Sequence, residues 1–150
     1  MNTPIIVIIS ILAFAVPAFA SDGLVNVKSS NSVIATADKM ETVLRDKGMT
    51  IFNRIKHSDG AGKVGIELRD TELIIFGNPK VGSPLMKCQQ AVAIDLPQKA
   101  LIWKDENGVV WISYNDPRFL EKRHGISGCE AVIAKIEKAL AGIVKKSATR

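Results

Sequence analysis

The chain has 150 residues, of which 47% are hydrophobic and 23% charged, and its formal net charge is +5. This length fits one domain that can bury a core and needs no metal merely to fold. The basic residues are dispersed, with no run longer than pairs such as Lys145-Lys146 and no alternation with aromatic residues. That pattern argues against a nucleic-acid partner, which requires a basic surface and stacking platforms.

The chain begins with an apolar segment that is typical of a signal peptide. Residues 4–20 carry no charged side chain and end in Ala18-Phe19-Ala20, the small-x-small pattern that precedes a cleavage site. The segment is shorter than the roughly 20 residues that span a bilayer. We therefore expect residues 1–20 to be removed between Ala20 and Ser21, leaving one domain at 21–150. That domain would be periplasmic or secreted, without a stable membrane anchor after cleavage.

The first half of that domain predicts alternating strands and a helix. Residues 24–29 alternate apolar and polar side chains as a half-buried strand does. A helix follows, with Asn31 or Ser32 as its N-cap and Gly48 as its left-handed C-terminal cap. Its apolar positions recur at helical spacing and are Val33, Ala37, Met40 and Leu44. Residues 49–57 and 71–76 predict two further strands, the second buried on most of its length.

Residues 101–114 predict a hairpin. The dipeptide Asn107-Gly108 favours a two-residue turn, which sets the pairing of the two strands. The pairs expected on the core face are Trp103 with Ile112 and Leu101 with Tyr114. Lys104 and Trp111 would then share the opposite face, where an exposed Trp marks a surface for a partner or contacts the Lys stem.

Two helices are predicted after the hairpin. Asp116 and Pro117 supply the N-cap and first residue of a short helix that Gly125 ends. Ser127 and Glu130 have the spacing of a capping box at the start of the last helix. One apolar stripe runs along that helix and consists of Val132, Ile133, Ile136, Ala139, Leu140, Ile143 and Val144.

The predicted order of the strands and the two long helices is strand, helix, four strands, helix, with short helical turns near 58–64 and 83–90 in addition to the short helix that Asp116 begins. Strands grouped between two long helices predict an α+β two-layer sandwich. We expect a mostly antiparallel sheet of about five strands, packed by the two main helices. No internal repeat, low-complexity tract or linker indicates a second domain.

Three blocks of the sequence resemble a known family signature. They are residues 76–86, the tripeptide at 95–97 and the tetrapeptide at 114–117. In this order, and with a Trp-containing hairpin before the third block, the chain resembles the domain of unknown function 302 family. The resemblance implies a TBP-like arrangement of sheet and helices, and it brings no established activity. The shared positions are Gly77, Asn78, Pro79, Lys80, Gly82, Pro84, Met86, Asp95, Leu96, Pro97, Tyr114, Asn115, Asp116 and Pro117.

Cys88 and Cys129 are the two cysteines, and an exported chain with an even count predicts a disulfide between them. The alternatives are two buried free thiols, or thiols that bind copper or exchange disulfides. No CxxC pair favours the redox alternative.

Catalytic, metal and cofactor motifs are weak or absent in the sequence. Residues 60–65 spell GxGxxG, but the next strand is predicted to begin only six residues after Gly65, which leaves no room for the helix that a dinucleotide loop requires, so we predict no cofactor. Neither His57 nor His124 has a second His or Cys at metal-ligand spacing. His124, near a helix end, is more simply a cationic cap. No nucleophile elbow, HExxH or paired-carboxylate pattern occurs, so we predict no catalytic residue.

The polar positions left over predict a binding role. We expect a non-catalytic module that binds an unknown small ligand or protein partner through loops at strand ends. Its candidate ligand-binding residues are His57, Asn78, Lys80, Asp95, Tyr114 and Asn115. One alternative is a structural protein that forms a homodimer or larger assembly through the face with Trp111. Another is copper or zinc binding by His57 with a carboxylate or thiol.

Overall fold

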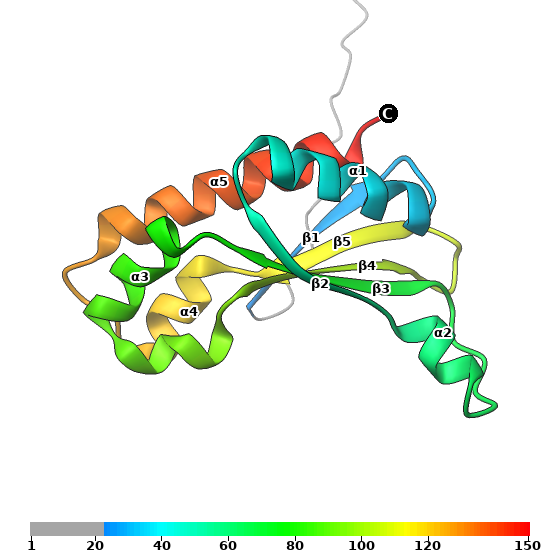
Figure 1. The fold of residues 1–150 in the computed structure, drawn as a ribbon, viewed down its shortest axis with the longest axis horizontal. Coiled ribbons are helices and arrows are strands. Elements are labelled where there is room, and N and C mark those ends of the chain that lie inside the picture. The colour runs from blue at the N-terminus through cyan, green and yellow to red at the C-terminus, as the bar shows by residue number, and fades with distance from the viewer. Residues whose placement is uncertain (1–22) are drawn as a thin grey trace, which may run out of the picture.

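Five antiparallel strands form one sheet in the computed structural model, which describes residues 23–150 (Figure 1). The predicted signal segment and its cleavage site lie outside the described residues. The strands are β1 (Leu24–Ser29), β2 (Thr50–Lys56), β3 (Thr71–Gly77), β4 (Gln98–Lys104) and β5 (Val110–Asn115). The helices are α1 (Val33–Asp46), α2 (His57–Gly62), α3 (Pro79–Cys88), α4 (Pro117–His124) and α5 (Glu130–Ala148), with a 3-10 turn η1 (Gln90–Asp95).

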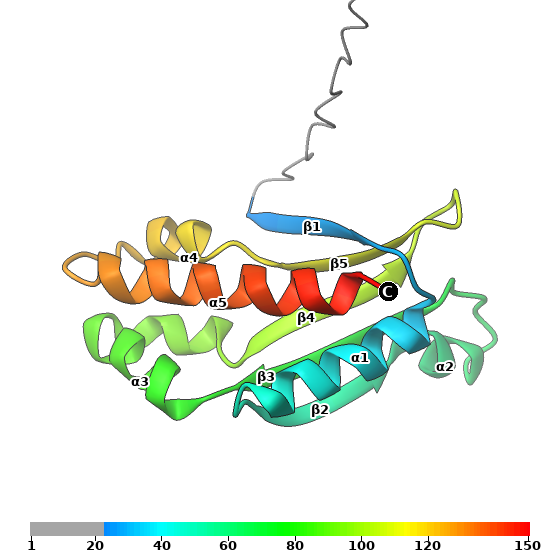
Figure 2. The same cartoon turned by 90° about the horizontal axis from the view of Figure 1, so that it is seen from above.

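The strand order across the sheet is β1-β5-β4-β3-β2, so β2 and β1 form its edges. The long helices α1 and α5 run antiparallel to each other over one face of the sheet (Figure 2). This is the predicted α+β two-layer sandwich of five strands and two main helices. The short helices predicted near 58–64 and 83–90 are α2 and α3. Within residues 23–150, no helix has the length and apolar character needed to cross a membrane.

The core lies between the helix pair and the sheet, where the predicted apolar stripes meet. Its largest fully buried side chains come from both layers and include Met40, Leu44, Ile74, Phe76, Ile102, Ile112, Ile133 and Ile143. On α1 the buried positions are spaced as predicted, because three- and four-residue steps return a side chain to the same helix face. Burial of these stripes against one sheet face is the main stabilising term.

Three of the predicted helix caps are present, two at the starts of helices and one at the end of α4. The Ser32 hydroxyl accepts a hydrogen bond from the Ala35 amide, and Asp116 does the same for α4. Gly125 has a φ of +58°, a left-handed conformation that favours glycine, and it ends α4.

The predicted capping box at the start of α5 is wrong. Cys129, not Ser127, is the N-cap residue, and its side chain caps no amide. Gly128, with a φ of +74°, turns the chain immediately before the helix and leaves Ser127 outside it. The Glu130 carboxylate does fold back, but it accepts from the Gly128 amide.

The predicted register of the hairpin is also wrong, by one residue. Trp103 lies opposite Trp111, whereas Ile102 lies opposite Ile112. The Asp105 carboxylate accepts hydrogen bonds from the amides of Asn107 and Val109, and the Asp105 amide donates to the Val109 carbonyl. These bonds close a three-residue loop in place of the two-residue turn. A shift of one residue exchanges the two faces of a strand.

The exchange places both tryptophans on the sheet face away from α1 and α5. The Trp103 indole donates to the Ser113 hydroxyl at 2.8 Å, and the Trp111 indole donates to Asp105 at 2.8 Å. Lys104 lies opposite Val110, so it does not share the face of Trp111 as predicted. Hydrogen bonds to the Trp111 indole and to backbone amides lower the pKa of Asp105.

Candidate functional site

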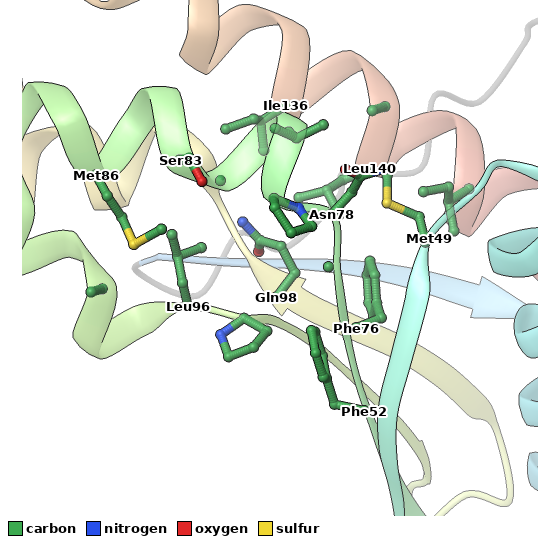
Figure 3. Close-up of a pocket in the computed structure, with 18 residues that line it drawn as sticks. Met49, Phe52, Phe76, Asn78, Ser83, Met86, Leu96, Gln98, Ile136 and Leu140 are labelled. Atoms are coloured by element: carbon green, nitrogen blue, oxygen red, sulfur yellow. The ribbon is translucent and has the colours of Figure 1, made fainter.

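An open pocket lies at one end of the sheet, between α3 and α5 (Figure 3). Its volume is about 370 Å³, which falls in the range of small-ligand sites. The sheet forms its floor, α5 one wall, and α3 with the η1–β4 connection the other. The lining residues are Met49, Phe52, Phe76, Gly77, Asn78, Pro79, Val81, Gly82, Ser83, Met86, Ala93, Leu96, Pro97, Gln98, Ile136, Ala139, Leu140 and Ile143.

The α3 wall starts directly at the end of β3 because residues 78–82 do not form the loop that we predicted. Asn78 is the N-cap of α3, and its side-chain oxygen accepts from the Lys80 amide at 2.9 Å. Pro79 occupies the first helical turn, where a missing N–H costs nothing. The amides of Val81 and Gly82 donate to the Asn78 carbonyl. The backbone amides of residues 80–82 are therefore used within the helix and its cap.

A disulfide joins the two walls of the pocket. Cys88 ends α3 and Cys129 precedes α5, and their Cα atoms lie 6.5 Å apart. The predicted Cys88–Cys129 bond is therefore confirmed. Among the residues of α3, only Leu85 is fully buried, so the disulfide is a major attachment of this wall.

The lining is apolar except for a few uncharged groups. Aliphatic, Met and Phe side chains make up most of the surface, and no charged residue lines the pocket in the part of the chain described here. The polar side chains are Asn78, Ser83 and Gln98, and the amide of Gln98 points into the space (Figure 3). Such a site can hold an apolar ligand and orient it with a small number of hydrogen bonds.

Of the candidate residues from the sequence, Asn78 lines the pocket and Lys80 lies beside it on α3. The Asn78 amide also donates to the Gly48 carbonyl at 2.9 Å, which fastens α3 to the α1–β2 turn. Lys80 is exposed.

Asp95 lies at the same end of the sheet, but it joins η1 to α4. Its carboxylate accepts from Arg123 at 3.1 Å and forms a 2.5 Å hydrogen bond with His124 Nε2. His124 therefore contacts a specific carboxylate, which is more than the general cationic cap that its position predicted. Through this contact, α4 positions the segment that continues into Leu96 and Pro97 of the pocket wall.

Tyr114, Asn115 and His57 lie outside the pocket lining. Tyr114 is buried on the helix-facing side of β5, and burial together with Asp116 and Glu137 raises the pKa of its hydroxyl. Asn115 ends β5 opposite Leu24 at the sheet edge. His57 begins α2 and is exposed at the other end of the sheet, next to the Lys56–Glu72 pair. The structure therefore does not bring His57 together with the other candidates.

Side chains of the metal-binding type do not gather within residues 23–150. No group of three or more His, Cys, Asp or Glu side chains in that range is arranged to hold an ion. The sulfurs of Cys88 and Cys129 belong to the disulfide, which lies at the opposite end of the sheet from His57.

Sequence reasoning missed most of the pocket. Phe52 is a large apolar residue that the structure places in an edge strand and leaves 56% exposed, and no pattern in the sequence marked it. Gln98 follows the block at 95–97 but was not singled out. Ile136 and Leu140 were assigned to the core stripe of α5, which they also serve.

The comparisons with known proteins agree with the fold. The family model described as domain of unknown function DUF302 matches residues 25–143. A solved structure, the uncharacterized conserved protein DUF302 from Bacillus stearothermophilus, superposes with a TM-score of 0.77 at 19% identity. The match covers 85% of this chain and 99% of that one. At this identity, the likeness concerns the fold alone.

Curated relatives carry the name of a fluoride-specific ion channel. "Fluoride-specific ion channel FluC 1" of Brucella suis biovar 1 is 40% identical over 126 residues, which are 84% of this chain and 50% of that protein. "Fluoride-specific ion channel FluC 2" of Brucella melitensis biotype 1 shows the same identity over 47% of its length. The chain thus spans about half the length of the curated relatives it matches.

Proposed function

The chain belongs to the DUF302 family, and we propose that within this family it is a non-catalytic module that binds a small apolar ligand. The observation that carries the proposal is the open pocket of about 370 Å³ between α3 and α5. An open pocket of this volume, lined mainly by apolar side chains with a few polar groups, is typical of a small-ligand site. The channel activity named for the Brucella relatives is not part of the proposal, since those proteins are about twice as long.

Binding is favoured over catalysis by the chemistry of the lining. Of the ionisable candidates at this end of the sheet, Asp95 is hydrogen-bonded to Arg123 and His124, and Lys80 is exposed on α3 outside the lining. General acid–base catalysis needs an ionisable group within hydrogen-bond reach of the substrate. Amides and one hydroxyl, the polar groups that the described lining offers, orient a ligand without exchanging protons at neutral pH.

A large side chain placed in the pocket should weaken binding. We expect Ala139→Trp to weaken binding of the neutral fluorophore N-phenyl-1-naphthylamine by at least about tenfold, because the indole occupies the space. Ala139 lies on α5 and lines the pocket, whereas Ala134 is an exposed alanine of the same helix. Ala134→Trp is therefore the matched control and should bind like the parent. Equal probe affinity in both variants, with unchanged circular dichroism, would overturn the proposal.

We also propose that the domain acts after export, in the periplasm or outside the cell. The disulfide supports this setting, because such bonds persist in oxidising compartments. Mass spectrometry of protein from the periplasmic fraction should give a chain that begins at Ser21 and is two hydrogens lighter than its reduced form. A full-length chain with free thiols in the cytoplasm would contradict this expectation.

A further inference from the structure

We propose that the pocket selects a neutral amphiphile, that is, a flexible apolar chain with one uncharged head group that hydrogen-bonds the Gln98 side-chain amide. The inference rests on the proposed function and names the ligand class of the same site. It is carried by three features of the lining, namely its adaptable apolar walls, one uncommitted amide and the absence of lining charge among the described residues.

The apolar walls suit a flexible chain. Met49 and Met86 face the space from opposite sides (Figure 3). Methionine is unbranched and has several rotatable bonds, so it repacks around ligands of irregular or variable shape. Phe52, which is 56% exposed, also lines the pocket. A bound chain would cover this ring.

The polar end of the ligand is fixed by Gln98. This residue belongs to β4 on the same side as the buried Ala100 and Ile102, so its side chain faces the helix layer and the pocket. Within residues 23–150 its amide forms no intramolecular hydrogen bond of its own, whereas the Asn78 amide is used at both atoms. Gln98 therefore offers one donor group and one acceptor to a ligand hydroxyl, carbonyl or amide. The Ser83 hydroxyl also lines the site.

The pocket should discriminate against charged head groups, because the ionic side chains around it are bonded to other protein groups or lie outside the lining. Asp95 is paired with Arg123 and His124, and the Lys99 ammonium donates to the carbonyls of Asp95 and Pro97. Lys80 is exposed on α3 and does not line the pocket. A charged head group would lose its hydration at the Gln98 end without meeting an opposite charge. The free energy of that desolvation is larger than for a neutral head group.

The test is a head-group series on one ten-carbon chain, measured at pH 8 by displacement of N-phenyl-1-naphthylamine. Decan-1-ol and decanamide should displace the probe at concentrations at least about tenfold lower than decanoate or decylammonium. Gln98→Leu should weaken decan-1-ol by about 3- to 10-fold relative to N-phenyl-1-naphthylamine, the range of one neutral hydrogen bond. Gln90→Leu, an exposed glutamine of η1, is the matched control.

The outcomes separate this inference from the proposed function. Decanoate binding more tightly than decan-1-ol, with the advantage lost in Lys80→Gln, would replace the neutral head group by an anion held at Lys80. Equal affinity for all head groups, or no effect of Gln98→Leu, would also overturn the inference while leaving an apolar site. Failure of the proposed function would be seen in a different experiment, the probe titration, as an affinity that Ala139→Trp does not change.

Discussion

Replacing Cys88 and Cys129 together by alanine should lower the free energy of unfolding by about 4 kcal/mol. The disulfide closes a loop with a sequence separation of 41, and cross-linking so long a loop removes many conformations from the unfolded chain. Cys88 is exposed and Cys129 half-buried, so the substitutions remove little packing. The loss therefore measures the covalent link, and urea denaturation gives its size.

The same variant should loosen the α3 wall of the pocket before the rest of the domain. Leu85 is the buried anchor of α3, whereas α1 and α5 each bury several side chains. An element with few buried contacts opens at low free energy once a covalent tie is removed. Hydrogen exchange of the α3 amides should accelerate more than that of α1, and the affinity for N-phenyl-1-naphthylamine should fall.

Reduction of the parent protein with dithiothreitol is the control for both effects. It breaks the bond and keeps the side chains, so its unfolding curve should coincide with that of the alanine variant. A parent protein that is equally stable before and after reduction would show that the link contributes nothing. Faster exchange spread evenly over α1 and α3 would contradict the local loosening of the wall.

The sequence predicted the strands and both long helices because each of these elements carries its own signal. The α1 stripe repeats at helical spacing, Ser32 provides an N-cap, and Gly48 adopts the left-handed conformation with a φ of +67°. These signals depend on residues within one or two turns of each other. The grouping of the strands between the two long helices predicted the two-layer arrangement, the family resemblance pointed to the same arrangement, and the structure confirms it.

The hairpin shows where a local signal is insufficient. Asn107-Gly108 favours a two-residue turn by its backbone preferences, but the side chain of Asp105 binds two amides of the loop and lengthens it. A competition between backbone preference and a side-chain bond is decided by small energy differences. Its outcome moved Trp103 from the core face to the opposite face.

The pocket was missed for a different reason. Its walls come from segments far apart in the chain, and each contribution has an ordinary structural explanation by itself. Ile136 and Leu140 read as core positions of α5, and Met49 follows a helix cap. Only their arrangement in three dimensions leaves a space between them, and no pattern within one element reports it.

Arg54→Met should cost about 3 kcal/mol of unfolding free energy, the second large effect that we expect. Arg54 extends from β2 and donates to Glu72 of β3 at 2.5 Å and to Asp38 of α1 at 2.6 Å. The Glu72 side chain is only 5% exposed and lies on the helix-facing side of the sheet. Burial alone would lower the pKa of Arg54, but the hydrogen bonds with Glu72 and Asp38 outweigh burial and raise it.

The cost arises because the variant leaves a carboxylate in the core layer without its partner. Arg45→Met is the matched control on the same surface. Arg45 is 64% exposed and pairs with Glu41 one turn earlier on α1, so its loss should cost about 0.5 kcal/mol or less. Urea denaturation of both variants separates a buried ionic contact from a solvated one.

A double variant decides whether the Arg54–Glu72 ion pair adds net stability to the fold, or whether its attraction only offsets the cost of burying the two charges. Arg54→Met combined with Glu72→Leu removes both charges and places an apolar side chain beside Ile74, on the face that already packs against α1. Because the desolvation cost disappears together with the attraction, we expect stability within about 1 kcal/mol of the parent. Asp38 is 62% exposed and remains hydrated, and Glu41 keeps Arg45. A double variant as unstable as Arg54→Met alone would mean that the ionic contact itself, and not the unpaired Glu72, holds β2 and β3 to α1.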